Sequence, residues 1–176
     1  LDKHILKHEL GHFVDNHAII RQKGLDKKSV EMLSATQSQI GNKTREFATK
    51  YNGKKELIDD ICKDLNIKYI GEKSTQPLSD IVNATTRETL GTEVSETFTK
   101  VVDGKTKTYG RPYYTKYIHE EEYWQEAGKV ESEVFAELWT IKNEKSATAR
   151  NRSVKVLNKY FPGLWDTFES TLKGLL

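Results

Sequence analysis

The sequence has a single cysteine, Cys62, among its 176 residues. One cysteine cannot form an internal disulfide, and it cannot build a zinc site from cysteine ligands. A bound metal would therefore have to be held by histidine, aspartate or glutamate side chains. The chain also has little net charge, because 28 basic residues are set against 26 acidic ones. This balance gives no electrostatic argument for nucleic acid or a membrane as a partner.

Long hydrophobic runs are absent as well. No apolar segment approaches the length of about 20 residues that spans a bilayer, and no secretion leader is recognisable. The composition, with 36% hydrophobic and 31% charged residues, is that of a polar globular protein. A chain of this length fits one domain, so we expect residues 1–176 to form a single unit. Because the first motif begins only seven residues after the start, we expect this unit to be a fragment of a longer polypeptide.

Apolar residues recur with a helical period over most of the chain. The pattern predicts helices over about residues 2–22, 26–50, 54–65, 78–86, 129–144, 147–160 and 163–175. A run rich in threonine, valine and aromatic residues between 94 and 114 contains Asp103-Gly104, which predicts a β-hairpin. The expected fold class is therefore α+β and mostly helical, with one small β-hairpin or sheet.

The stretch HELGH, which begins at His8, carries the strongest chemical signal in the chain. On a helix His8 and His12 project from the same face, and Glu9 lies beside them, offset by about 100°. In the H-E-x-x-H arrangement two imidazoles bind zinc and the glutamate acts as a general base on water. Gly11 allows another chain segment to approach the metal face closely, and Asp15 lies where its carboxylate could hold an imidazole N–H.

The other histidines offer little as a third protein ligand. His17 lies five residues after His12, whereas the pattern H-E-x-x-H-x-x-G-x-x-H needs six. His4 lies one turn before the motif, and three ligands in successive turns of a straight helix cannot converge on one ion, so we expect it to pack or to support a ligand. His119, in the second half of the chain, stays open as a ligand.

A second helical segment, ESEVFAELW, offers carboxylate ligands. Glu133 and Glu137 lie four residues apart on one side of this helix, and Phe135, Leu138 and Trp139 form much of the other side. A carboxylate from this segment would complete a site of two histidines and one glutamate, as in one class of zinc peptidases. Spacing alone does not distinguish this role from that of an ordinary solvated helix face.

These motifs together resemble a known family. H-E-x-G-H-x-x-D followed much later by E-x-F-A-E looks like the zincin-type metallopeptidase domains related to anthrax lethal factor and the Pro-Pro endopeptidases. In those domains the first glutamate of the second motif is the third zinc ligand. The resemblance thus implies a zincin-like fold in which His8, His12 and Glu133 bind zinc and Glu137 supports the site.

The order of the motifs is more similar to zincin-like domains in minor head and head-morphogenesis proteins of tailed bacteriophages. The shared segments are the H-E-x-G-H-x-x-D helix, LSDIV, a histidine before a Tyr-Trp pair in YIHEEEYWQEAG, the E-x-F-A helix and the closing FPGLWDTFESTL. The likeness extends through most of the chain and is weakest in residues 25–75. It implies a peptide or protein substrate, or other phage structural proteins, as partners, and a location in the virion or in the cytoplasm of a bacterial host.

One departure from the peptidases concerns the group that stabilises the oxyanion. The toxin-like peptidases carry a tyrosine seven residues before the ligand glutamate, and this position is Glu126 here. The candidates for this role are Tyr123, His119 and, in the hairpin, Tyr109. The sequence does not choose among them.

The spacing of the motifs and the start of the chain differ as well. His12 and Glu133 are 133 minus 12, or 121, residues apart, far more than in the peptidases. The hairpin lies within this excess, where it could cover the cleft, shape it or bind another protein. Zincins normally place a small sheet before the motif helix and hold substrate along its edge strand. Either this sheet is missing from the fragment, or the 94–114 hairpin is the only sheet available.

Three functions stay open from the sequence. In the first, the chain is a zinc metallopeptidase in which Glu9 is the general base and Tyr123 or His119 steadies the tetrahedral intermediate. In the second, the same zinc site is a catalytically silent structural staple in a phage minor capsid protein or a comparable assembly component. In the third, the chain is a helical interaction module without metal, and the motif residues coincide by chance.

Overall fold

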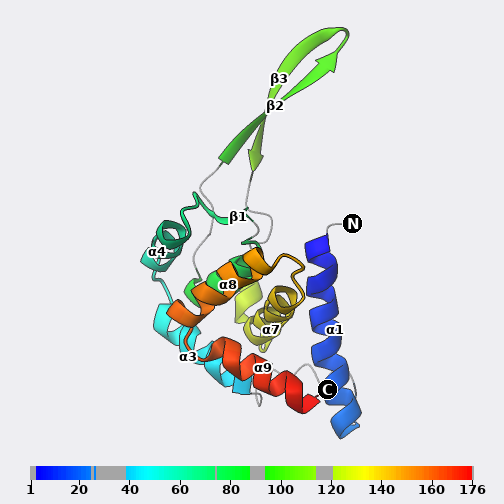
Figure 1. Ribbon diagram of the computed structural model, residues 1–176, viewed down its shortest axis with the longest axis vertical. Coiled ribbons are helices and arrows are strands. Elements are labelled where there is room, and N and C mark those ends of the chain that lie inside the picture. The colour runs from blue at the N-terminus through cyan, green and yellow to red at the C-terminus, as the bar shows by residue number, and fades with distance from the viewer. Residues whose placement is uncertain are drawn as a thin grey trace.

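The computed structural model describes residues 3–24, 26, 39–73, 75–87, 94–113 and 121–175. Within these residues helices predominate and one sheet has two antiparallel strands, which confirms the predicted α+β, mostly helical fold class. In chain order the elements are α1 (Lys3–Lys23), α3 (Gln39–Tyr51), α4 (Glu56–Leu65), β1 (Ile70–Lys73), α5 (Pro77–Thr86), β2 (Val94–Val102), β3 (Lys105–Tyr113), α6 (Glu121–Gln125), α7 (Lys129–Lys142), α8 (Ala147–Tyr160) and α9 (Leu164–Leu175) (Figure 1).

Most elements agree with the sequence prediction. The helix expected over 26–50 is described only from Gln39 onward, because residues 27–38 lie outside the described part of the chain. The short strand β1 was not predicted, since four residues are too few to show a clear period. None of the described helices is both long enough and apolar enough to cross a membrane.

The core is built around α7, which lies at the centre of the helical body with α1 on one side and α3 on the other (Figure 1). Val134, Phe135, Leu138 and Ile141 of α7 are buried against the surrounding helices. Every residue of α5 is buried as well. Each large apolar side chain that is removed from water contributes about 1.5–3 kcal/mol, so α7 is a fixed platform for any group that it carries.

Helix α1 forms where predicted, but most of its apolar stripe does not face the core. Ile5, Leu6, Leu10 and Phe13 are 39%, 49%, 47% and 55% exposed. The side of α1 that carries the histidines faces α7 instead. Of the predicted stripe, Val14 packs against the core, so the attachment of α1 combines this contact and the close approach at Gly11 with the polar side chains.

Gly11 sets the distance between α1 and α7. A Cβ atom added at Gly11 would lie 2.6 Å from the Cα and 2.9 Å from the carbonyl oxygen of Ala136. Real Cβ atoms do not approach the backbone so closely, so only glycine permits this crossing. The expectation that Gly11 allows another segment to come near the histidine face is confirmed.

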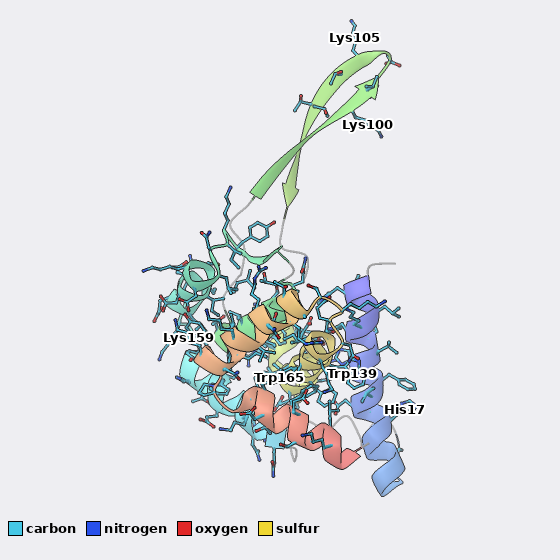
Figure 2. All side chains as sticks on the ribbon, viewed as in Figure 1. His17, Lys100, Lys105, Trp139, Lys159 and Trp165 are labelled. Carbon is cyan, nitrogen blue, oxygen red and sulfur yellow. The ribbon has the colours of Figure 1, made fainter. Side chains whose placement is uncertain are left out.

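The predicted hairpin is also confirmed. Strands β2 and β3 pair antiparallel around Asp103-Gly104, and both turn residues have positive φ, at 54° and 70°. Such values match the right-handed twist of the two strands. The hairpin extends away from the helical body, with Lys100 and Lys105 near its tip (Figures 1 and 2). In this arrangement it does not cover α1 and α7.

Gly11→Ala should separate α1 from α7 although alanine is the better helix former. We expect a loss of about 1–3 kcal/mol in the free energy of unfolding, because the new methyl group overlaps the backbone at Ala136. Chemical denaturation of the variant would measure this loss. Leu10→Ala, at an exposed position on the same helix, is the control and should change stability by less than about 0.5 kcal/mol. A Gly11→Ala protein more stable than the parent would contradict the close crossing.

Candidate metal centre

Two helices that are far apart in the sequence bring three donor groups together. His8 and His12 come from α1, and Glu133 comes from α7. The Oε2 atom of Glu133 lies 2.9 Å from His8 Nε2 and 3.5 Å from His12 Nε2. The two Nε2 atoms are 3.0 Å apart. These atoms converge on a single point between the helices.

The donor set fits a zinc ion. In a tetrahedral site with bonds of about 2.0–2.1 Å, the ligand atoms are about 3.3 Å from one another. The separations of 2.9, 3.0 and 3.5 Å among the Nε2 and Oε2 atoms are close to this value. Two imidazole nitrogens and a carboxylate oxygen that face each other need a shared cation or proton between them. His8, His12 and Glu133 could therefore hold a metal ion, with two nitrogen ligands and one oxygen ligand.

The cluster is buried on one side and open on the other. The side chain of Glu133 is 6% exposed, whereas those of His8 and His12 are 14% and 22% exposed. Catalytic zinc sites have three protein ligands and keep one position open. The greater exposure of the two histidines leaves room for such a position on the solvent side.

Other polar groups hold the second nitrogen of each imidazole. His8 Nδ1 lies 3.1 Å from Glu137 Oε1, and His4 Nε2 lies 3.3 Å from the same oxygen. His12 Nδ1 lies 3.1 Å from Ser132 Oγ. Such contacts fix the orientation and the protonated nitrogen of a metal-binding imidazole. His4 and Glu137 thus take the supporting positions that the sequence suggested for them.

Asp80 of α5 completes the buried side of the cluster. Asp80 is 2% exposed. One carboxylate oxygen of Asp80, one carboxylate oxygen of Glu137 and one ring nitrogen of His8 lie within 4.8 Å of one another. Glu137 is fully buried at 0%. Three carboxylates therefore meet the histidines in a region almost closed to water. Such a concentration of negative charge needs compensating protons or a cation.

The cluster changes the pKa values of its members. Burial lowers the pKa of His8, but hydrogen bonds and charge interactions with Glu133 and Glu137 outweigh it and raise the pKa to about 10. Burial, together with the negative charges of Glu137 and Glu133, raises the pKa of Asp80 to about 8. Burial alone would raise the pKa of Glu133, but hydrogen bonds with the histidines and Tyr123 hold it well below its usual range. Without metal, His8 is protonated at neutral pH.

Tyr123 is the candidate for stabilising the oxyanion whose side chain the structure describes, and it contacts the cluster. Its hydroxyl donates a hydrogen bond to Glu133 Oε1. Burial and this hydrogen bond raise the pKa of Tyr123 above its usual range, so it stays a neutral donor. His119 lies outside the described residues, as does the side chain of Tyr109. The exposed Glu126, which occupies the position of the peptidase tyrosine, pairs with Lys129 at 3.9 Å instead.

Two other residues of α1, Glu9 and His17, are exposed. Glu9, next to His8, is exposed and open to solvent. His17 lies 3.1 Å from the carbonyl oxygen of Phe13, stacks on the Phe13 ring and points away from α7 (Figure 2). Its position agrees with the expectation that His17 is not a ligand.

Ser132 and Asp80 were not predicted from the sequence. Ser132 Oγ lies at hydrogen-bond distance from His12 Nδ1, and Asp15, which was expected to hold an imidazole N–H, is buried. Nothing in the spacing singles out a serine in ESEVF. Asp80 did leave a signal, because it is the acidic residue within the apolar segment LSDIV. A charged residue within an otherwise apolar, buried segment indicates an ion-pair or hydrogen-bond partner, or a functional role.

The affinity for zinc should rise with pH. Metal-bound imidazole is neutral, so binding must displace the proton that His8 carries below its pKa of about 10. We expect the affinity to increase about tenfold per pH unit between about pH 6 and pH 8, with release of about one proton from His8. Competition with a chromophoric chelator would measure the affinity, and calorimetry in buffers of different ionisation enthalpy would count the protons. A pH-independent affinity across this range would contradict the protonation state assigned to His8.

Comparison of the chain with protein-family models, curated proteins and solved structures gives no match. The main structural indication of function is therefore the convergence of His8, His12 and Glu133, with Glu137 and Tyr123 beside them.

Proposed function

We propose that the chain is a zinc-dependent metallopeptidase domain of the zincin type. The observation that carries the proposal is the meeting of His8 and His12 of α1 with Glu133 of α7, because this donor set and its partly open side are those of a hydrolytic zinc site. The sequence resemblance to zincin-like domains of phage head proteins and of toxin-like peptidases supports the same assignment. When bound, zinc supplies the Lewis acidity that makes water an effective nucleophile near neutral pH.

In the proposed mechanism, the residues around the donors have separate roles in peptide hydrolysis. Glu9 is exposed beside His8, so its carboxylate can accept the proton of the attacking water and deliver it to the leaving amine. The hydroxyl of Tyr123 donates its single proton to Glu133, so it would have to turn from Glu133 to hydrogen-bond the oxyanion of the tetrahedral intermediate. Glu137 and Ser132 hold the far nitrogens of the two imidazoles and keep the Nε2 atoms directed toward the centre.

Glu9→Gln should abolish cleavage without affecting metal content. Loss of a general base costs about 10²–10⁴-fold in rate, while the three donor residues stay intact. A library of quenched fluorescent peptides would measure cleavage, and elemental analysis would measure zinc. Glu46→Gln, on the exposed side of α3, is the matched control and should keep full activity. Glu133→Gln should lose zinc and activity together. A Glu9→Gln protein as active as the parent would rule out this mechanism.

A second candidate function is a zinc staple in a structural protein, and the packing of α1 favours it. Four apolar residues of α1 are exposed, namely Ile5, Leu6, Leu10 and Phe13, and polar side chains provide much of its attachment to α7. A metal shared between His8, His12 and Glu133 would supply binding free energy that hydrophobic burial does not provide here. In this role the domain needs no substrate, and other structural proteins would be its partners.

Chelation distinguishes the staple from a dispensable site. At a free zinc concentration of about one hundred times the dissociation constant, binding stabilises the fold by about 2.7 kcal/mol, so stripping the metal should lower the melting temperature by about 5–10 °C. Hydrogen exchange should increase first in α1. A staple without catalysis would show this loss and no cleavage of any library peptide. An unchanged melting temperature after complete removal of zinc would exclude the staple.

A further inference from the structure

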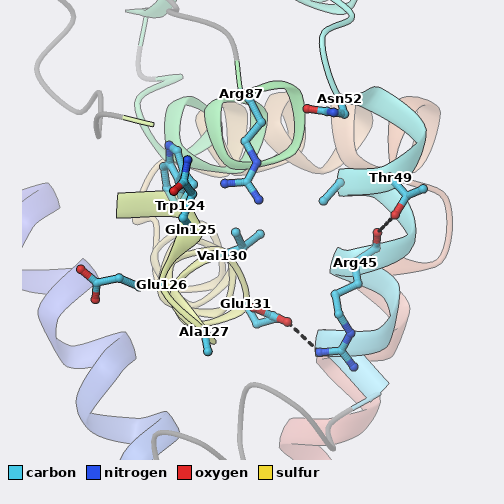
Figure 3. Close-up of a pocket in the computed structure, with 11 residues that line it drawn as sticks. Arg45, Thr49, Asn52, Arg87, Trp124, Gln125, Glu126, Ala127, Val130 and Glu131 are labelled. Carbon is cyan, nitrogen blue, oxygen red and sulfur yellow. Dashed lines mark hydrogen bonds and ion pairs between the residues drawn. The ribbon is translucent and has the colours of Figure 1, made fainter. Parts of the chain in front are cut away.

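Two features outside the candidate metal centre could bind a partner, and one of them is a cavity. It measures about 550 Å³ and lies between α3, α6 and α7 (Figure 3). Its wall has two arginines, Arg45 and Arg87, and two glutamates, Glu126 and Glu131, so the wall carries no net charge. Arg45 pairs with Glu131 at 2.6 Å. This balance selects no class of ligand, so the second feature, the β2–β3 hairpin, is the stronger candidate.

The hairpin tip, residues 99–108, is exposed apart from the half-buried Val102. The hairpin extends from the helical body, and Lys100 and Lys105 lie near its end (Figures 1 and 2). In the described part of the chain the sheet consists of β2 and β3 alone. Two-stranded hairpins are marginally stable in water unless a further strand or a helix packs against them. The hairpin tip therefore has the form of an incomplete sheet.

Three lysines lie on one face of the hairpin tip. Lys100 is directly opposite Lys107 in the register of the two strands, and Lys105 is opposite Val102. Because side chains alternate between the two faces along a strand, these three lysines share a face. No ion partner of theirs lies among the described residues. The hairpin from Val94 to Tyr113 has four basic and two acidic residues, so it carries the whole net charge of +2 of the chain.

The outer edge of β3 offers backbone groups beside these lysines. In a hairpin closed by a two-residue turn, the pair next to the turn exchanges both backbone hydrogen bonds, and bonded and non-bonded pairs alternate from there. Val102 with Lys105 is this first pair, so Thr106 and Thr108 belong to non-bonded pairs. Their N–H and C=O groups therefore point away from β2. Pro112, four residues after Thr108, agrees with this alternation, because proline in a strand needs a position whose N–H lies outside the ladder.

An extended acidic segment fits this edge better than other occupants. A strand added along β3 places its side chains about 5 Å from those that they face, so acidic residues at alternate positions would pair with Lys105 and Lys107. Within the hairpin tip β2 has only one lysine, Lys100, so its edge is less basic. A second copy of the hairpin would bring the same lysines to the edge, and repulsion between like charges opposes such a pairing.

We propose that an extended acidic segment of another protein adds to the β3 edge of the hairpin tip as a third strand. Backbone hydrogen bonds with Thr106 and Thr108 provide affinity, and Lys105 and Lys107 select a segment with acidic residues at alternate positions. The hairpin extends away from α1 and α7, so this partner is distinct from a peptidase substrate (Figure 1). The proposal does not depend on zinc or on cleavage.

A fluorescein-labelled peptide of alternating threonine and glutamate tests the proposal on the intact chain. Its fluorescence anisotropy should rise on binding at low ionic strength. The same peptide with glutamine in place of glutamate should bind about three- to tenfold more weakly, because two pairs of opposite charges are lost. The double variant Lys105→Gln, Lys107→Gln should lose about the same factor for the glutamate peptide. The matched control is Lys54→Gln, Lys55→Gln, which removes two exposed lysines before α4 and should bind like the parent.

Proline substitutions separate strand addition from general attraction between charges. Thr108→Pro removes an N–H from the β3 edge and leaves all three lysines, so it should abolish binding of the glutamate peptide. Thr99→Pro, in the same cross-strand pair but on the β2 edge, is its control and should bind like the parent. Both N–H groups lie outside the hairpin ladder, and the hairpin tip lies outside the helical core, so both variants should keep the melting temperature of the parent.

Several results would overturn the proposal. These are equal binding of the two peptides, unchanged binding in the double lysine variant or in Thr108→Pro, loss of binding in Thr99→Pro, and no binding at millimolar concentration. Tighter binding of duplex DNA than of the glutamate peptide, unaffected by Thr108→Pro, would also overturn it, because it would show attraction to polyanions without strand addition.

Discussion

The approach of α1 to α7 at Gly11 and Ala136 is the contact on which the candidate metal centre depends. Imidazole and carboxylate side chains are short, so donors on two helices can share one ion only when the helix axes are unusually near. A residue with a Cβ atom at Gly11 would meet the backbone of α7. The glycine inside HELGH is therefore a packing residue that allows the donors of the candidate metal centre to meet.

The second constraint is the burial of charge. Glu133, Glu137 and Asp80 lie in the interior and can stay there only with protons, histidines or a cation to balance them. The neighbouring carboxylates raise the pKa values of His8 and Asp80, which favours the protonated form of both groups. A divalent cation would replace those protons. The same polar layer joins α1 to the body, so the chemistry of the site and the attachment of the helix are linked.

Local patterns in the sequence were enough to predict much of the fold. The helical period located α4, α5, α7, α8 and α9, and Asp103-Gly104 located the hairpin turn, because these features depend on residues that are close in the chain. The direction in which α1 faces was not predictable in this way. Its apolar stripe suggested a buried face, yet the histidines face inward. Their partner groups on α7 and α5 are more than 60 residues away in sequence, so a local pattern could not indicate this direction.

The sequence by itself determined that His8 and His12 share a helix face with Glu9 beside them, because the geometry of a helix is set within one turn. It also determined that any metal site must use histidine and carboxylate ligands, since one cysteine excludes the alternatives. Only the tertiary structure decided which carboxylate meets the imidazoles and that Ser132 and Asp80 join the cluster. These contacts depend on how helices pack across more than 60 residues of chain, which spacing does not encode.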